Sequence, residues 1–265
     1  MQKVREAERG VVYDKFIGYE NEIITGEVER QDSRFLYIIL PGNQEAAMKQ
    51  GDQMPNETYR MGDKIKVLVS QVQNEQRGPQ VFVSRTHADL VKRLFEAEVP
   101  EVFDGTVEIK SIAREAGDRS KIAVYSHNSN LDAVGTMVGQ RGARVQAVVN
   151  ELSGENMDIV EWTEDPAQFI KNALNPAEVV EVIFDPTNDR AVTVLVPDYQ
   201  LSLAIGKRGQ NARLAARLTG FKIDIKPESE RDAVIADMAN REEEAANAPV
   251  VEADVADDFE ETDEA

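Results

Sequence analysis

Between residues 21 and 86, short runs rich in apolar residues, some of them alternating with polar residues, are separated by turn residues. This pattern is typical of β-strands that bury one face. Strands are expected at Ile23–Glu29, Phe35–Leu40, Glu45–Lys49, Lys64–Val72 and Val81–Arg85. Five short strands in so short a stretch predict a small β-barrel.

A second pattern begins at residue 87, where one stretch of sequence occurs twice. Residues 138–145 (VGQRGARV) recur as residues 205–212 (IGKRGQNA), which places Gly139 and Gly206 at matching positions 67 residues apart. A second pair of anchors follows, because residues 152–154 (LSG) match residues 218–220 (LTG) at an offset of 66. Repetition at a fixed offset indicates two copies of one structural unit.

The surroundings of each copy predict the same order of elements. A helix comes first (88–97 and 166–174), then two strands (106–112 with 122–125, and 179–184 with 191–196), then a short helix, the Gly-X-X-Gly turn, a second helix and a last strand. We call residues 87–164 the first repeat unit and residues 165–226 the second repeat unit.

The Gly-X-X-Gly turn has a chemistry that suits phosphate. Glycine lacks the Cβ that would keep a ligand from the backbone, and the amides that open the following helix point at the same place. Arg141 in the first copy, and Lys207 with Arg208 in the second, add mobile positive charge. Apolar residues beside each turn would line a narrow groove, which fits unpaired bases better than a duplex.

These residues resemble the KH domain, an RNA-binding module whose Gly-X-X-Gly loop clamps the backbone of about four nucleotides. The leading helix and the terminal strand point to its bacterial, type II arrangement. The resemblance assigns phosphate contact to Gly139, Gln140, Arg141, Gly142, Gly206, Lys207, Arg208 and Gly209. Arg144 and Asn211, one turn further along, could reach sugar or base edges. The alternative is that both turns are only tight connections between helices.

The barrel resembles the ribosomal S-one type of OB domain, which binds single strands on one face. If the side of Leu36, Ile38 and Leu40 faces the interior, Phe35 and Tyr37 form a stacking platform for RNA. Otherwise they are core aromatics, which is the interpretation the sequence favours. That type usually carries a histidine on its binding face, and this chain has none before His87.

An S-one-type domain followed by two KH domains resembles the NusA family of bacterial transcription elongation, termination and antitermination factors. The resemblance implies single-stranded nascent RNA and RNA polymerase as partners, and pausing, termination and antitermination as the processes affected. Members normally begin with a further polymerase-binding domain. Residues 1–20 look like the helix that follows it, so we expect that domain to be missing. The alternatives are the RNA-tethering region of a processing enzyme and a protein-interaction module.

Composition limits the remaining possibilities. The net charge of −19 arises mostly in residues 227–265, which hold fifteen acidic residues and two arginines; residues 1–226 carry −6. We expect this tail to be disordered, with a helical continuation over 229–244, and a weaker hypothesis is that it competes with RNA for the cationic loops. The sequence has no cysteine and two histidines, and no catalytic motif. We therefore expect no enzyme activity, cofactor, metal or membrane span, and a cytoplasmic monomer of α+β class.

Overall fold

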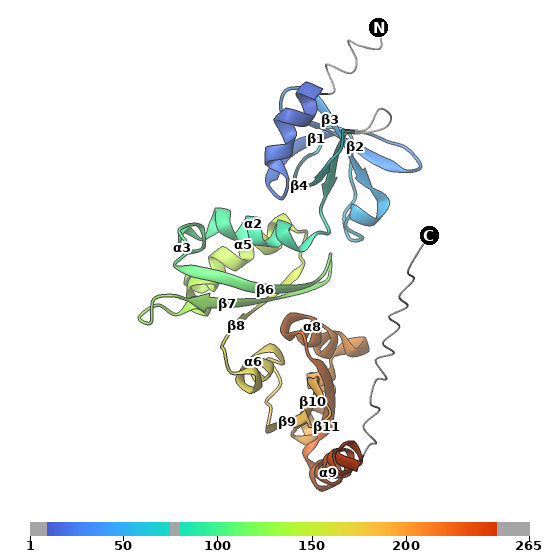
Figure 1. The fold of residues 1–265 in the computed structure, drawn as a ribbon. Coiled ribbons are helices and arrows are strands. Elements are labelled where there is room, and N and C mark those ends of the chain that lie inside the picture. The colour runs from blue at the N-terminus through green and yellow to red at the C-terminus, as the bar shows by residue number, and fades with distance from the viewer. Residues whose placement is uncertain (1–9, 75–79, 248–265) are drawn as a thin grey trace, which may run out of the picture.

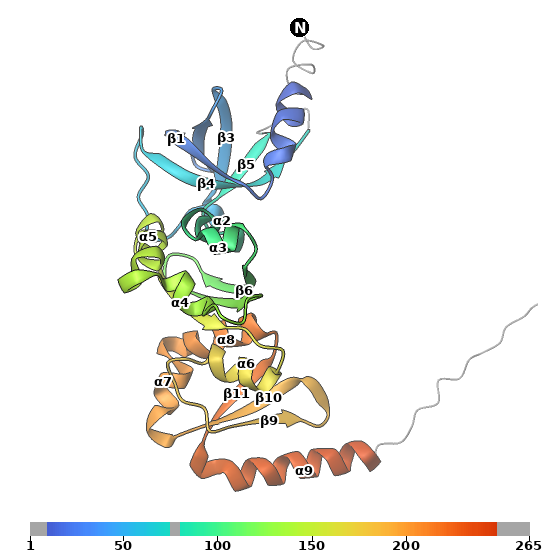
Figure 2. The same cartoon turned by 90° about the vertical axis from the view of Figure 1, so that its left-hand side faces the viewer.

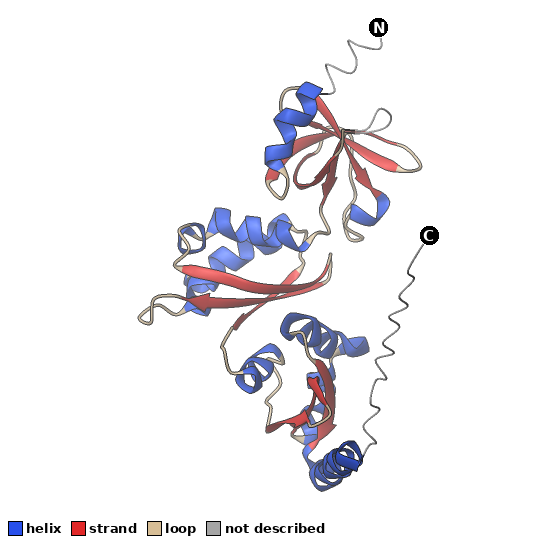
Figure 3. Ribbon diagram, in the orientation of Figure 1, coloured by secondary structure: helices blue, strands red, loops and turns tan. Residues whose placement is uncertain are grey.

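The first part of the chain forms a closed β-barrel. The computed structural model describes residues 10–74 and 80–247, and it arranges them as three successive units (Figures 1 and 3). The five strands hydrogen-bond in the order β1-β2-β3-β5-β4, which confirms the predicted barrel. They are β1 (Ile23–Gln31), β2 (Phe35–Leu40), β3 (Gln44–Lys49), β4 (Lys64–Val72) and β5 (Val81–Ser84), with the short helices η1 (Ile17–Tyr19) and η2 (Gln50–Asp52) beside them.

The side of β2 that carries Leu36, Ile38 and Leu40 faces the barrel interior, where all three are buried. A helix over residues 10–16 brings Phe16 into the same core. Phe35 and Tyr37 therefore lie on the outer side, because neighbouring strand residues point to opposite faces. The two rings are therefore not part of the barrel interior, but Tyr37 is buried with Ala47 and Phe82 in a small cluster on the outer side, and Phe35 packs against it.

The first repeat unit begins with two helices and continues as a three-stranded sheet. In chain order it contains α2 (Ala88–Glu98), α3 (Pro100–Phe103), β6 (Val107–Glu115), β7 (Arg119–Ser126), α4 (Ala133–Val138), η3 (Gln140–Gly142), α5 (Ala143–Glu151) and β8 (Asn156–Glu161). Strands β6 and β7 pair antiparallel, whereas β7 and β8 pair parallel. The hairpin is longer than predicted because residues 113–115 also pair with residues 119–121 next to the turn.

The second repeat unit has the same order of elements and the same strand pairing. It contains α6 (Pro166–Ala173), β9 (Glu181–Asp185), β10 (Asn188–Val196), η4 (Asp198–Gln200), α7 (Leu201–Ile205), η5 (Lys207–Gly209), α8 (Gln210–Thr219) and β11 (Lys222–Pro227). Strands β9 and β10 are antiparallel, and β10 and β11 are parallel. The two copies inferred from the sequence therefore share one topology.

The chain continues as η6 (Glu228–Glu230) and the long helix α9 (Arg231–Asn247), which Figure 2 shows lying across the far end of the second repeat unit. Val234 and Met238, four residues apart, pack against Leu195 and Ile183 of its sheet. This helix corresponds to the predicted helical continuation. The rest of the predicted disordered tail, residues 248–265, lies outside the described residues, as do residues 1–9 of the expected connecting helix.

Both faces of the first sheet are covered. One face packs with α2 and α5 in the core of its own unit, through residues such as Ile122 and Val124. The other face places Ala113, Ala123 and Val160 in the core of the second repeat unit, against α6 and α8. The second repeat unit is thus built directly on the first.

Buried polar contacts fix the joint between the barrel and the first repeat unit. The side chain of Arg85, 2% exposed, donates to a Glu57 carboxylate oxygen at 2.7 Å and to the carbonyl of Glu151 on α5 at 2.9 Å. Burial alone would raise the pKa of Glu57, but the hydrogen bonds and charge of Arg85 outweigh it, and the pKa is lowered. The carboxylate is therefore held ionised at the joint.

Polar contacts also join the two repeat units. The buried ammonium of Lys121 on β7 donates to the carbonyl of Asn175 at 2.9 Å. Arg213 on α8 pairs with Glu115 on β6 at 2.6 Å. Trp162, in the connection, lies with its ring centroid 6.4 Å from that of Phe169 on α6. The position of each loop relative to the other is thus set by packed contacts.

Candidate nucleic-acid interface

The two Gly-X-X-Gly turns have the same backbone conformation. Gly139 and Gly206 adopt φ/ψ of 75°/176° and 77°/173°, and the closing residues Gly142 and Gly209 adopt 78°/13° and 73°/15°. All four have a positive φ, the region that glycine enters readily and other residues resist. The repeat seen in the sequence is therefore a repeat of conformation, and the pattern of glycines is what the conformation requires.

The first glycine of each turn also has to be small, because the residue five positions later packs against it. A Cβ built on Gly139 would lie 2.7 Å from Cγ of Arg144, and one built on Gly206 would lie 2.8 Å from the backbone nitrogen of Asn211. No such contact exists at Gly209, where a Cβ would meet open space. The first glycine is thus needed for space and torsion, and Gly209 for torsion alone.

The side chains between the glycines are exposed and carry positive charge. Gln140, Arg141, Lys207 and Arg208 are all exposed. Within the described part of the chain, no carboxylate lies within 4.0 Å of the charged nitrogens of Arg141, Lys207 or Arg208. Arg141 and Arg208 share a left-handed backbone, with φ of 52° and 54°. Three cations that no described carboxylate pairs with are therefore presented at the two turns, where an anion could reach them.

Arg144 and Asn211 donate hydrogen bonds to main-chain carbonyls near the two turns. Arg144 donates to Glu101 at 3.0 Å and to the carbonyl of Thr136 at 2.8 Å. Asn211 is 2% exposed and donates to the carbonyls of Leu174 and Ala204. Asn211 thus lies inside the unit, and its amide holds the end of α7 in place, whereas Arg144 remains partly exposed.

A groove of about 630 Å³ adjoins the first turn. It is lined by Leu131, Asp132, Thr136, Gln140 and Arg144, among others. The floor is apolar at Leu131, and polar groups surround it. This arrangement can hold a flat, polar-edged group such as a base beside a phosphate bound at Gly139. The helices that lead into the two turns, α4 and α7, lie on the same side of the molecule in Figure 2.

The outer face of the barrel carries an aromatic cluster that the sequence identified only in part. Phe35 lies 5.9 Å from Tyr37 and 6.2 Å from Phe82, measured between ring centroids. Arg30 sits 3.4 Å from the Tyr37 centroid and Lys49 lies 4.8 Å from that of Phe82. Single-stranded bases stack on exposed rings beside cations. Tyr37 and Phe82 are buried, at 9% and 8% exposure, so the partly exposed ring of Phe35 is the one that a base could reach.

Tyr37 is held in this cluster by Asp32, whose carboxylate accepts a hydrogen bond from the Tyr37 hydroxyl at 3.0 Å. The backbone N–H groups of Arg34 and Phe35 also donate to Asp32, and they are the main reason that its pKa is lowered. Phe82 escaped notice in the sequence because β5 reads as a continuous apolar run. Its position two strands away from Phe35 follows only from barrel closure.

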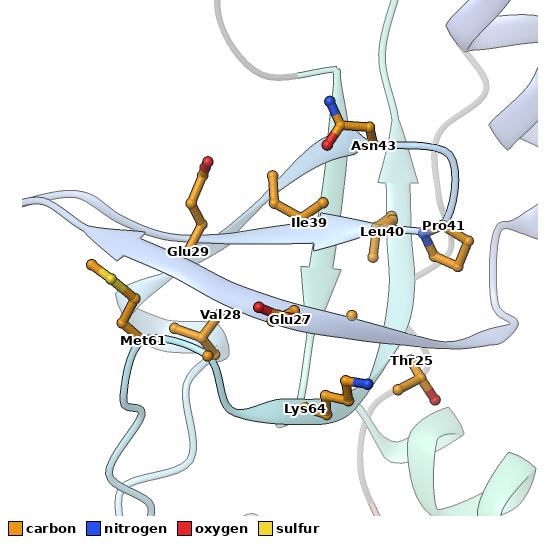
Figure 4. A pocket seen from close by; sticks show the side chains of 12 residues that line it. Thr25, Glu27, Val28, Glu29, Ile39, Leu40, Pro41, Asn43, Met61 and Lys64 are labelled. Carbon is orange, nitrogen blue, oxygen red and sulfur yellow. The ribbon is translucent and has the colours of Figure 1, made fainter.

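A second groove, on the barrel and lined by residues of β1, β2 and β4, has an unsuitable charge for RNA. It measures about 610 Å³ and is bordered by Glu27 and Glu29 on β1, with Lys64 as its cation (Figure 4). Its apolar floor includes Leu40 and Pro41. Two carboxylates against one ammonium would repel a phosphate backbone. The candidate interface therefore comprises the two turns and the aromatic cluster, and leaves this groove out.

Two further observations bear on the class of protein. None of the helices within residues 10–74 and 80–247 has the length and apolar character needed to cross a bilayer. The same residues contain no cluster of three or more histidines and carboxylates placed to hold a metal ion. His87 is an N-cap, because its Nδ1 accepts the N–H of Asp89 at 3.2 Å.

Comparison with known families identifies both repeat units. A model of the NusA-like first KH domain matches residues 85–162, and a model of the NusA-like second KH domain matches residues 166–233. With the five-stranded barrel before them, these matches confirm the predicted fold class of an OB-like barrel followed by two KH domains.

Similar full-length sequences carry one description, transcription termination/antitermination protein NusA. The protein from Halalkalibacterium halodurans is 56% identical over 93% of this chain and 63% of its own length. That from Bacillus subtilis is 59% identical over 86% of this chain and 61% of its own length. That from Mycobacterium bovis is 47% identical over 85% and 67% respectively. The chain thus spans less than two thirds of the first two relatives.

Proposed function

We propose that this chain, which belongs to the NusA family, is a non-enzymatic factor that binds nascent single-stranded RNA and modulates pausing, termination and antitermination by RNA polymerase. The observation that carries the RNA binding is the pair of turns with matching torsions, which present Arg141, Lys207 and Arg208 without carboxylate partners among the described residues. Polymerase as a partner follows from the descriptions of the relatives, which are termination and antitermination proteins.

The proposed contacts differ in kind along the chain. Gly139, Gly142, Gly206 and Gly209 allow the phosphate backbone to approach the main chain, and the exposed side chains between them supply charge. Gln140 can donate its amide to a phosphate or a base. On the barrel, the partly exposed ring of Phe35 would stack a base, and the buried Tyr37 and Phe82 would support it from the same cluster.

Arg144 and Asn211 have different roles in the proposed RNA binding. Arg144 keeps enough exposure to reach a sugar or base at the edge of its groove while it remains paired with Glu101. Asn211 acts through position, because its buried amide bonds the carbonyls that shape the second turn. We therefore propose direct RNA contact for Arg144 and a positioning role for Asn211.

The experiment is a fluorescence anisotropy titration of labelled single-stranded RNA with the full chain and two double variants. Gln140→Asp/Arg141→Asp and Lys207→Asp/Arg208→Asp replace exposed side chains, so circular dichroism and the melting temperature should be unchanged. Together they should weaken binding by a few kcal/mol and reduce the dependence of affinity on salt. The same affinity in all variants would refute the proposal.

Two controls separate this function from the alternatives. Incubation of the pure protein with labelled RNA, magnesium and phosphate should leave the RNA at full length, and reproducible shortening would favour a processing enzyme. A pull-down of RNA polymerase with and without nuclease treatment tests the partner. Retention that does not depend on RNA would show direct association, and loss after nuclease would show that RNA bridges the two.

A further inference from the structure

Exposed apolar side chains lie on η4 and α7, the two short helices before the second turn: Tyr199, Leu203 and Ile205. Tyr199 in η4 is 81% exposed, and Leu203 in α7 is 47% exposed. Because they are four residues apart in consecutive helical turns, they lie on the same side. Within the described residues the Tyr199 ring has no aromatic or cationic neighbour, and its hydroxyl contacts only the Gln200 amide at 3.3 Å.

We propose that Tyr199 and Leu203 form a nucleobase subsite that extends the second turn. Seven residues separate Tyr199 from Gly206, a rise of about 10 Å along a helix. A strand whose phosphate is bound at Lys207 and Arg208 therefore reaches Tyr199 with the nucleotides next to it. The exposed ring offers a flat surface for stacking, and Leu203 fills the space between ring and turn.

The charge around the subsite favours RNA as its occupant. Lys207 and Arg208 lie at the end of α7 and have no carboxylate partner in the part of the chain described. The one acidic neighbour in η4, Asp198, accepts a hydrogen bond from the N–H of Ser229 at 3.1 Å. A planar ring about 10 Å along the helix from two cations, which no described carboxylate pairs with, suits a base that neighbours the phosphate held at the turn.

The first repeat unit lacks this subsite. The positions that match Tyr199 and Leu203 hold Asp132 and Thr136. The Thr136 hydroxyl donates to the carbonyl of Asp132 at 2.7 Å, and its own carbonyl accepts from Arg144. Polar groups that are already bonded replace the exposed ring. The two units should therefore bind bases differently, with stacking at the second unit and polar contacts at the first.

The subsite rests on the proposed RNA binding, so its test must be able to refute the subsite while RNA binding by the turns still holds. Anisotropy titrations with labelled oligoadenylate and oligouridylate of about twelve nucleotides measure affinity and its salt dependence for the full chain. Tyr199→Ala should weaken oligoadenylate binding about 5- to 150-fold, and oligouridylate binding less, because purines stack more strongly. The slope of affinity against salt should stay the same, because no phosphate contact is lost.

Further variants distinguish stacking from a purely apolar contact. Tyr199→Phe should bind like the unchanged chain, and Tyr199→Leu should bind like Tyr199→Ala, because an apolar side chain without a flat face cannot stack. Phe103→Ala removes an equally exposed ring, also 81% accessible, from the first repeat unit and should have no effect. Lys207→Ala/Arg208→Ala should instead lower the salt slope by about two.

The outcomes separate the two proposals. If the Lys207 and Arg208 variant loses affinity while Tyr199→Ala does not, the subsite is refuted and the RNA-binding proposal stands. Full binding by Tyr199→Leu, or an altered salt slope in Tyr199→Ala, would also overturn the subsite. If neither set of variants changes affinity, the proposed function fails and the subsite fails with it.

Discussion

The guanidinium of Arg85, which directly follows the strand β5, donates to the main-chain carbonyl of Glu151 on α5 at 2.9 Å. The same side chain holds the carboxylate of Glu57 and the carbonyl of Lys66. One buried arginine therefore satisfies acceptors from two units. Removal of one partner from such a buried set destabilises the fold by more than the whole set stabilises it. The remaining charged and polar groups stay buried, with neither a protein partner nor water to bond to.

Arg85→Met should lower the free energy of unfolding of the barrel and first repeat unit by about 3–5 kcal/mol, because it leaves Glu57 charged and unpaired inside the joint. Arg85→Lys should recover only part of this loss, since an ammonium cannot donate as a planar fork. Urea denaturation measures both. Arg60→Met, at an exposed position, is the control and should change stability by less than about 0.5 kcal/mol. Equal losses of stability in Arg85→Met and Arg60→Met would contradict the proposed role of Arg85 at the joint.

The joint should also make stability depend on pH in the acid range. The pKa of Glu57 lies below its ordinary value of 4.5, so the unfolded chain takes up a proton at a higher pH than the folded chain. Its contribution is therefore complete above pH 4.5 and is lost as the pH falls through the folded-state pKa. The stability difference between the unchanged chain and Glu57→Gln, measured by urea denaturation from pH 7 downward, should shrink below about 4.5. A difference that grows on acidification would refute this.

The two glycines of the second turn should differ in their tolerance of alanine. Gly209→Ala should cost about 1–2 kcal/mol of stability, because a left-handed residue with a Cβ is strained but meets open space. Gly206→Ala should cost more, because its Cβ would also lie 2.8 Å from the backbone of Asn211. Thermal and urea unfolding provide the comparison. A smaller effect at Gly206 than at Gly209 would mean that the turn relaxes more readily than its packing indicates.

Neighbouring residues of β2 should separate stability from RNA binding. Leu36→Ala removes a core side chain that is 1% exposed and should cost about 2–5 kcal/mol of stability. Phe35→Ala removes a ring from the outer face and should cost less stability, but about 1–3 kcal/mol of RNA binding through lost stacking. Unfolding curves and anisotropy titrations of both variants give the answer. Unchanged RNA affinity in Phe35→Ala would exclude the barrel face from the interface.

The features that the sequence predicted are those that leave a local pattern. The strands of the barrel follow from alternation, and the two turns follow from glycines whose positive φ no other residue adopts easily. The side of β2 that faces the core was misjudged, because alternation gives two faces but not which one is buried. That choice depends on Phe16 and the other strands.

Contacts between distant parts of the chain left no such pattern. Arg85 meets Glu151 sixty-six residues later, and Lys121 meets Asn175 after fifty-four. Nothing near either residue distinguishes it from a solvated charge. The burial of Asn211 was hidden for the same reason, because its partners Leu174 and Ala204 are brought to it by the fold. Tyr199 was overlooked because an isolated tyrosine in a turn has no periodic context.

Helix α9 has a consequence for how far this architecture can extend. The outer face of the first sheet serves as the foundation for the next unit, and the equivalent face of the second sheet is occupied by Val234 and Met238 of α9. Ion pairs at both ends, Arg231 with Glu181 and Arg241 with Asp185, fasten the helix there. A third unit of the same kind could not pack on this face, because α9 already occupies it. The helix therefore covers the face on which another unit of the same kind would pack, much as capping repeats cover the last face of a solenoid.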